Sequence, residues 1–214
     1  MNIIGIDQLI YGANDLAASV KFMQDFGLTE VPNQAFGRYF ATLDGTGILV
    51  AEAEHASLPA KLPSMSQLRK MVYGVVDQAT LDAIQAELST DREVKVMDNG
   101  ALESVDDSGI TIGFQISIRR ELNLLAEKIN APGAAHGRAL NVLGVDHSIE
   151  IQPRTIAHTA VFVPDAAKAE AFYVKRLGFR VSDRLGGGPF LRAGGTTDHH
   201  TLFLIQAPEH IKGV

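Results

Sequence analysis

Cysteine is absent from the 214 residues, and its absence excludes several kinds of site. The chain can form no disulfide bond and no thiolate zinc site, and it has no cysteine nucleophile. A metal ion bound by this chain would therefore need His, Asp or Glu side chains as ligands.

A long apolar run, a basic segment and a signal-peptide pattern are also missing. A membrane-spanning helix needs about 20 consecutive apolar residues, and no stretch of the chain approaches that length. The formal net charge is −6 and no basic run occurs, which argues against nucleic acid or an anionic membrane as a partner. The first residues have neither a basic head nor a small-residue cleavage site, so we expect a cytoplasmic protein. With 46% apolar residues, the chain can bury a sizeable core.

An internal repeat is visible once Gln8 is aligned with His158. Residues 8–28 then match residues 158–179, and an aspartate follows seven positions after the aligned pair in both copies. Each copy begins with a short apolar run typical of a strand. A helix of about three turns is predicted next, from apolar residues at spacings of three and four.

Aspartate and glycine mark the ends of the predicted helices. Asp15 and Asp165 stand where an N-cap belongs, because a carboxylate there can accept the N–H groups of the first turn. Gly27 and Gly178 follow the last helical turn, a position that favours glycine. Strand-like segments separated by glycine-rich turns come after each helix. Each unit is therefore predicted as a strand, a helix and about three strands.

A weaker third copy lies in the middle of the chain. A strand over 71–77 runs into Asp77 as an N-cap, and a helix is predicted over 79–89. The strands expected after it are 93–97, 101–105 and 111–117. A short helix is also predicted over 119–129.

The expected fold class is α+β, with three βαβββ modules in two domains. The modules cover about 1–55, 66–118 and 154–207. The expected domains are an N-terminal pair of modules over 1–125, a connector over 126–153 and the third module over 154–214.

This arrangement resembles the vicinal oxygen chelate superfamily, and within it the type I extradiol ring-cleaving dioxygenases. The resemblance rests on the three modules and on the histidine, His158, that opens the third. It implies curved-sheet cups with helices outside and four modules in two domains. Since three modules are present, we expect the fourth to be missing, the chain to be truncated before it, and the C-terminal metal-binding domain to be incomplete.

The resemblance also implies site residues. In such enzymes the first strand of module three carries a metal-binding histidine, and His158 matches its place. Residues 198–202 (DHHTL) resemble a later strand with a His-His pair, whose second member acts as an acid/base. His200 is therefore the expected catalytic residue, with His199 as the alternative, because neighbours on a strand point to opposite faces. The remaining His and Glu ligands are expected beyond Val214.

The first two modules are expected to bind no metal. Gln8 occupies the His158 position in module one and Lys70 in module two, and neither is a suitable Fe(II) ligand. Aromatic residues on the third helix, Phe172 and Tyr173, are expected in the core. The pair at 106–107, Asp-Asp, is expected to be a solvated turn.

The expected function is Fe(II)-dependent extradiol cleavage of a catechol-like aromatic substrate by O2, with Mn(II) as the alternative metal. We expect the metal in the full-length protein, not in the 214-residue chain alone, and a homo-oligomeric assembly. One alternative is a glyoxalase-type metal lyase or isomerase, which would need Glu ligands inside the modules. Another is a non-enzymatic, bleomycin-resistance-type binding protein, which would need no metal histidine.

Overall fold

The computed structural model describes residues 1–62, 67–124, 130–144 and 146–208, which form three units of one element order. The first unit consists of β1 (Ile3–Ala13), α1 (Leu16–Asp25), β2 (Thr29–Val31), β3 (Arg38–Ala41) and β4 (Gly47–Glu52). The second consists of β5 (Leu68–Val75), α2 (Gln78–Leu88), β6 (Lys95–Val96), β7 (Leu102–Val105) and β8 (Thr111–Ile116). The third consists of β9 (Thr159–Val163), α3 (Ala166–Leu177), β10 (Arg180–Leu185), β11 (Gly188–Arg192) and β12 (Leu202–Gln206). The predicted α+β class is confirmed.

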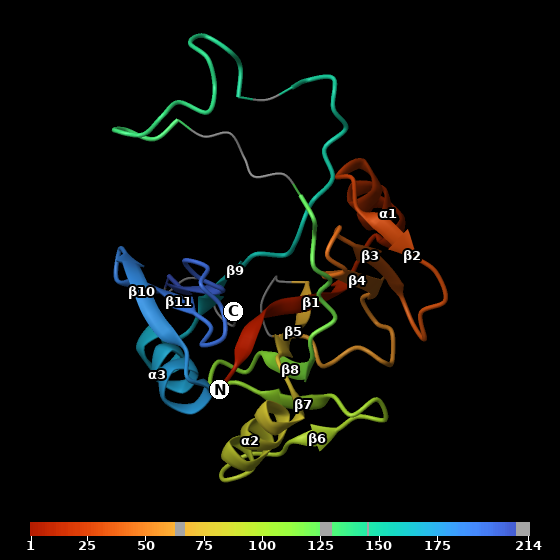
Figure 1. Ribbon diagram of the computed structural model, residues 1–214. Helices are drawn as coiled ribbons and strands as arrows, with labels where there is room; N and C mark the ends of the chain where they lie inside the picture. The colour runs from red at the N-terminus through yellow and green to blue at the C-terminus, as the bar shows by residue number, and fades with distance from the viewer. Residues whose placement is uncertain (63–66, 125–129, 145, 209–214) are drawn as a thin grey trace.

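The first two units share one eight-stranded sheet, in the order β2-β3-β4-β1-β5-β8-β7-β6. The antiparallel pair β1–β5 joins them at the centre (Figure 1). The third unit forms a separate four-stranded sheet, β10-β11-β12-β9, which repeats the order β2-β3-β4-β1. The strand order expected from the internal repeat is therefore present. Within the described residues the large sheet is open, since β2 and β6 are its two ends.

The helix ends follow from local sequence in all three units. Asp15, Asp77 and Asp165 each accept the backbone N–H three residues later, at 2.9, 2.8 and 2.9 Å, as N-caps do. Gly178 ends α3 with φ of 73°, and Gly27 follows α1 with φ of 86°. Both φ values lie in the left-handed region, which glycine adopts without the strain of a Cβ atom.

The third unit packs against the second through α3. Phe172 and Tyr173 are buried there, as expected, and the Tyr173 hydroxyl donates a 2.8 Å hydrogen bond to Asp106. The prediction of a solvated turn at 106–107 is wrong for Asp106, which is only 5% exposed. The aspartate is buried because α3 covers the turn before β8, a contact between distant parts of the sequence. Asp107 accepts a 2.9 Å hydrogen bond from Arg92.

The segment after β8 crosses to the first unit and is not helical over 119–124. The Arg119 guanidinium donates to the Ile6 carbonyl at 2.7 Å, and the Arg120 N–H to the Asp44 carbonyl at 2.7 Å. These contacts hold an irregular backbone against β1 and the β3–β4 turn, so the predicted helix is wrong there. Its remaining residues, 125–129, lie outside the described part of the chain.

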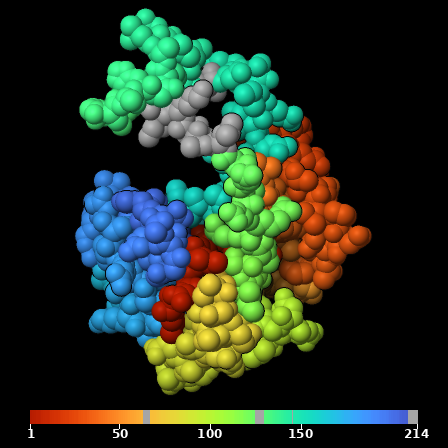
Figure 2. All heavy atoms as spheres, viewed as in Figure 1, coloured from red at the N-terminus to blue at the C-terminus, as the bar shows by residue number. Residues whose placement is uncertain are grey.

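The segment between the second and third units and the start of the chain lie as follows in the molecule. Residues 130–144 extend away from the sheets, and the third unit lies beside the start of the chain (Figure 2). Gly195 N–H donates to the Ile3 carbonyl at 2.8 Å at that contact. None of the helices in the described ranges is long and apolar enough to cross a membrane.

Candidate functional site

Two of the predicted site histidines, His158 and His200, lie side by side because each stands just before one of two paired parallel strands. Strand β12 pairs with β9 so that Leu202 lies opposite Thr159, and the Thr159 N–H donates to the Thr201 carbonyl at 3.1 Å. His158 immediately precedes β9, and His200 lies just before β12. The centroids of the two imidazole rings are consequently 4.2 Å apart.

The His199 ring lies against His200 and faces Asp183. Its Nδ1 atom lies 3.0 Å from Nδ1 of His200, and its Nε2 atom faces the Asp183 carboxylate at 3.9 Å. The His199 side chain is 57% exposed, whereas His200 is partly buried. Of the two neighbouring histidines, the structure therefore places His200 beside His158.

An aromatic wall lies next to His200. The Phe190 ring is 4.8 Å from the His200 ring and stacks on Phe203 at 4.1 Å. This stack forms because the two phenylalanines are cross-strand partners on β11 and β12. Sequence reasoning placed both residues on strands but had no signal for their contact with the histidine.

The surroundings of His200 favour its neutral form. Partial burial lowers the pKa of His200, and the adjacent imidazoles of His158 and His199 lower this pKa further. Desolvation and like charge both disfavour a cation. His200 is therefore an uncharged imidazole at neutral pH, able to accept a proton or a hydrogen bond.

The described residues offer imidazole nitrogens to a metal but no complete ligand set. Imidazole suits Fe(II) and Mn(II) centres of the type that uses two histidines and one carboxylate. Among the described residues, no group of three or more His, Cys, Asp or Glu side chains is arranged to hold a metal ion. His158 can thus be one ligand, and a set of two histidines and one carboxylate is not complete among the described residues.

The repeat allows the same position to be inspected in the first two units. Gln8 and Lys70 lie seven residues before the N-caps Asp15 and Asp77, as His158 lies before Asp165. Lys70 is largely buried and forms a 2.7 Å ion pair with Glu103 on β7. The sequence identified Lys70 at this position, but its pairing with Glu103 was not anticipated.

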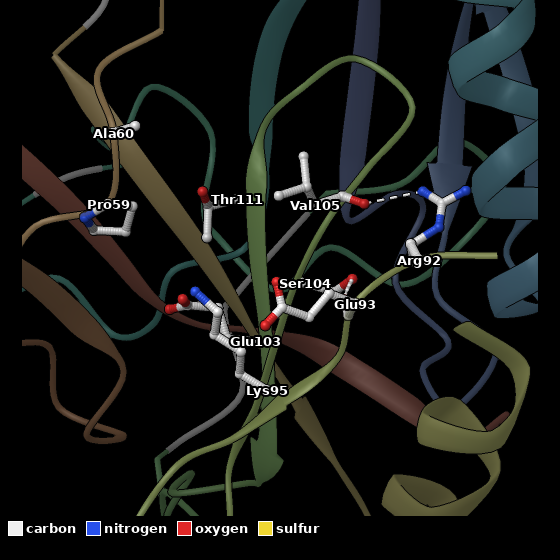
Figure 3. A pocket seen from close by; sticks show the side chains of 9 residues that line it. All are labelled: Pro59, Ala60, Arg92, Glu93, Lys95, Glu103, Ser104, Val105 and Thr111. Carbon is white, nitrogen blue, oxygen red and sulfur yellow. Dashed lines mark hydrogen bonds between the residues drawn. The ribbon is translucent and has the colours of Figure 1, made fainter. Parts of the chain in front are cut away.

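A cavity of about 300 Å³ opens over β7 and β8, beside the loop at Pro59 (Figure 3). Glu103 and Lys95, which are cross-strand partners, line it together with Thr111. Arg92, another lining residue, points toward α3. Its guanidinium donates to the Val105 carbonyl on β7 at 2.9 Å and lies over the Phe172 ring of α3. No histidine is among its lining residues, so this cavity is separate from the His158–His200 pair.

The third unit carries a family signature. Residues 155–213 match the sequence model of the Glyoxalase/Bleomycin resistance protein/Dioxygenase superfamily. The resemblance predicted from the repeat and from His158 is confirmed. No curated protein sequence matches the chain closely enough to count as a relative.

Solved structures of a glyoxalase and of several dioxygenases share the fold over nearly the whole chain. The Mn(II)-bound glyoxalase from Novosphingobium aromaticivorans is 18% identical with a TM-score of 0.68, over 97% of this chain and 63% of its own. Homoprotocatechuate 2,3-dioxygenase from Arthrobacter globiformis is 16% identical with a TM-score of 0.64, over 96% and 60%. The 2,2',3-trihydroxybiphenyl 1,2-dioxygenase from Sphingomonas wittichii strain RW1 is 20% identical with a TM-score of 0.61, over 96% and 68%.

These neighbours are longer than the chain. It spans 63% of the glyoxalase and 64% of BphC, a halotolerant catechol dioxygenase with a TM-score of 0.63. At such low identity the similarity shows the fold alone.

Proposed function

We propose that this chain is part of an Fe(II)-dependent extradiol dioxygenase that cleaves a catechol-type aromatic ring. The observation that carries the proposal is the 4.2 Å approach of the His158 and His200 rings at the entries of β9 and β12. Several structural neighbours named as catechol or homoprotocatechuate dioxygenases support it.

In this proposal His158 is a metal ligand and His200 is a positioned base. A bound Fe(II), held in part by His158, would supply Lewis acidity toward the catechol hydroxyls and redox chemistry with O2. The neutral His200 imidazole accepts a proton from a substrate hydroxyl as the catechol binds. The stacked Phe190 and Phe203 rings offer an apolar wall to a planar substrate beside that base.

A glyoxalase-type metal lyase or isomerase is the second candidate. The Mn(II)-bound glyoxalase has the highest TM-score of the neighbours described above, 0.68, and this favours it. The two candidates differ in substrate: ring cleavage consumes O2 and a catechol, whereas the lyase or isomerase needs no O2. A bleomycin-resistance-type binding protein would need neither O2 nor the His158 imidazole.

The test compares three histidine variants in the full-length protein. Metal content is measured on the purified protein, and ring cleavage is followed as O2 consumption with catechol. His158→Ala is expected to lose the metal. His200→Gln is expected to retain the metal and substrate binding, while turnover falls by about 10²–10⁴-fold, as when a positioned acid/base is lost. His199→Gln is the matched control and is expected to leave both unchanged.

Three results would contradict the assignment. Loss of metal in His200→Gln would make His200 a ligand. Loss of turnover in His199→Gln, with His200→Gln still active, would make His199 the working residue. A protein that holds no metal and consumes no O2 would favour the binding-protein alternative. For the 214-residue chain alone, we expect weak Fe(II) binding in an anaerobic titration, because His158 supplies only one ligand.

A further inference from the structure

A second cavity, of about 280 Å³, lies in the first unit between α1 and the strands β1 and β4. Its walls are mainly apolar and are formed by Phe22, Met23, Ile48 and Val50. Tyr11, Ser19 and Gln67 are the lining residues that carry polar side-chain atoms. All three units have a helix beside their sheet, but this hollow involves none of the residues around His158.

The volume limits what the cavity can hold. An apolar cavity of about 150 Å³ is enough for one benzene ring. Sites for drug-sized ligands have about 300–1,000 Å³. At about 280 Å³, the cavity fits one substituted aromatic ring or two fused rings.

The lining chemistry selects a neutral ligand with a hydrogen-bonding group. None of the lining residues is charged, so a carboxylate would lose its hydration without gaining an ion pair. The Ser19 hydroxyl already donates to the Asp15 carbonyl at 2.8 Å. The Tyr11 hydroxyl has no hydrogen-bond partner among the described residues, and burial raises the pKa of Tyr11, which keeps this phenol protonated.

One lining residue provides an aromatic surface. Phe22 is 60% exposed, and its ring stacks on Phe26 at 5.8 Å. Phe22 lines the cavity and is also exposed to solvent, so a planar ligand in the cavity can cover its ring.

We propose that this cavity is a binding site for neutral phenols of one or two rings, with Tyr11 as the hydrogen-bonding residue and Phe22 as the stacking residue. The site goes beyond the proposed function, because it lies in the first unit and requires no metal. Its test is independent of ring cleavage and can be made on the 214-residue chain.

The experiment measures binding of p-cresol by titration calorimetry and ligand-observed NMR, with toluene and benzoate as companion probes. We expect p-cresol to bind with a Kd at or below about 1 mM, toluene more weakly, and benzoate at least tenfold more weakly. Tyr11→Phe keeps the ring but removes the hydroxyl. It is expected to weaken p-cresol by about two- to tenfold and to leave toluene unchanged.

Two tryptophan variants form a matched pair on α1. Ser19→Trp places a large ring in the cavity and is expected to abolish binding of p-cresol. Ala17→Trp places the same ring at an exposed position outside the cavity and is expected to bind p-cresol as the parent chain does. If Ser19→Trp fails to fold, Phe22→Ser replaces it, since the exposed Phe22 contributes little to the core; it is expected to weaken binding at least fivefold.

The proposal is overturned if the parent chain shows no binding of p-cresol at millimolar concentration. It is also overturned if the correctly folded Ser19→Trp variant binds like Ala17→Trp, or if Phe22→Ser binds like the parent chain. Equal weakening of p-cresol and toluene in Tyr11→Phe would refute the role of the Tyr11 hydroxyl.

Discussion

The contact between the second and third units can be tested by removing a single oxygen atom. In Tyr173→Phe the aromatic ring keeps its place on α3, but the 2.8 Å hydrogen bond to the Asp106 carboxylate is lost. Tyr173 is 0% exposed, so water cannot simply replace the hydroxyl. The other carboxylate oxygen still accepts the N–H groups of Ser108 and Ile110, at 2.8 and 2.9 Å. The variant therefore leaves one oxygen of a buried carboxylate without its partner.

The expected loss at neutral pH is about 1.5–3 kcal/mol of unfolding free energy, the range for a hydrogen bond to a charged group. For a chain of this size, each 1 kcal/mol corresponds to a fall in Tm of about 2–4 °C. Burial raises the pKa of Asp106, while the hydrogen bonds from Tyr173, Ile110 and Ser108 lower it. Removal of the Tyr173 hydroxyl should therefore raise this pKa further.

The pH dependence has a definite sign. A carboxyl whose folded pKa exceeds its unfolded value of about 3.9 destabilises the fold as the pH rises from that value through the folded pKa. Because the variant has the higher folded pKa, its deficit grows with pH. Toward pH 4 a larger fraction of the carboxyl is neutral in the fold, and the deficit should shrink toward the about 0.5–1.5 kcal/mol of a hydrogen bond between neutral groups.

Urea unfolding of both proteins at the two pH values measures these deficits. Tyr11→Phe is the matched control, since the Tyr11 hydroxyl has no partner in the described part of the protein; its change is expected within about 0.5 kcal/mol. A deficit below this value in Tyr173→Phe, or one that is the same at both pH values, would refute the assigned role of the contact.

Three further changes test the helices of the third and second units. Asp165→Ala removes the N-cap of α3 and is expected to lower the unfolding free energy by about 1 kcal/mol in thermal denaturation; no change would mean that the cap is dispensable. Gly178→Ala forces a Cβ into the left-handed region at φ of 73° and should cost about 1–2 kcal/mol in the same assay, whereas a neutral result would show that the turn relaxes. Arg176→Gln removes the α3 side of the ion pairs with Glu87 and Asp91. Hydrogen bonds from Arg92 and from Arg176 hold the pKa of the Asp91 carboxyl well below its usual range. The Tm of the Arg176→Gln variant should fall, and the difference should shrink in 1 M NaCl, where charges are screened beyond about 3 Å; a difference that is independent of salt would contradict an electrostatic role.

The sequence alone predicted the features that depend on local interactions. The spacing of seven residues from His158, Gln8 and Lys70 to an N-cap aspartate identified three units with the same start. Aspartate at N-caps and glycine after helices act through their own backbone neighbourhood, which is why these positions were correct. Alternating and helical apolar patterns likewise placed most strands and the three helices.

Tertiary structure decided the features that depend on which distant segments meet. A pattern along one strand could not choose between His199 and His200, but the parallel pairing of β12 with β9 puts the His200 ring beside that of His158. Docking of α3 turned a predicted surface turn at Asp106 into a buried hydrogen-bond acceptor. The contacts of Arg119 replaced a predicted helix with irregular backbone. Burial and partner choice in these cases come from contacts between segments that are distant in the sequence, and the free energy of those contacts outweighs local propensity.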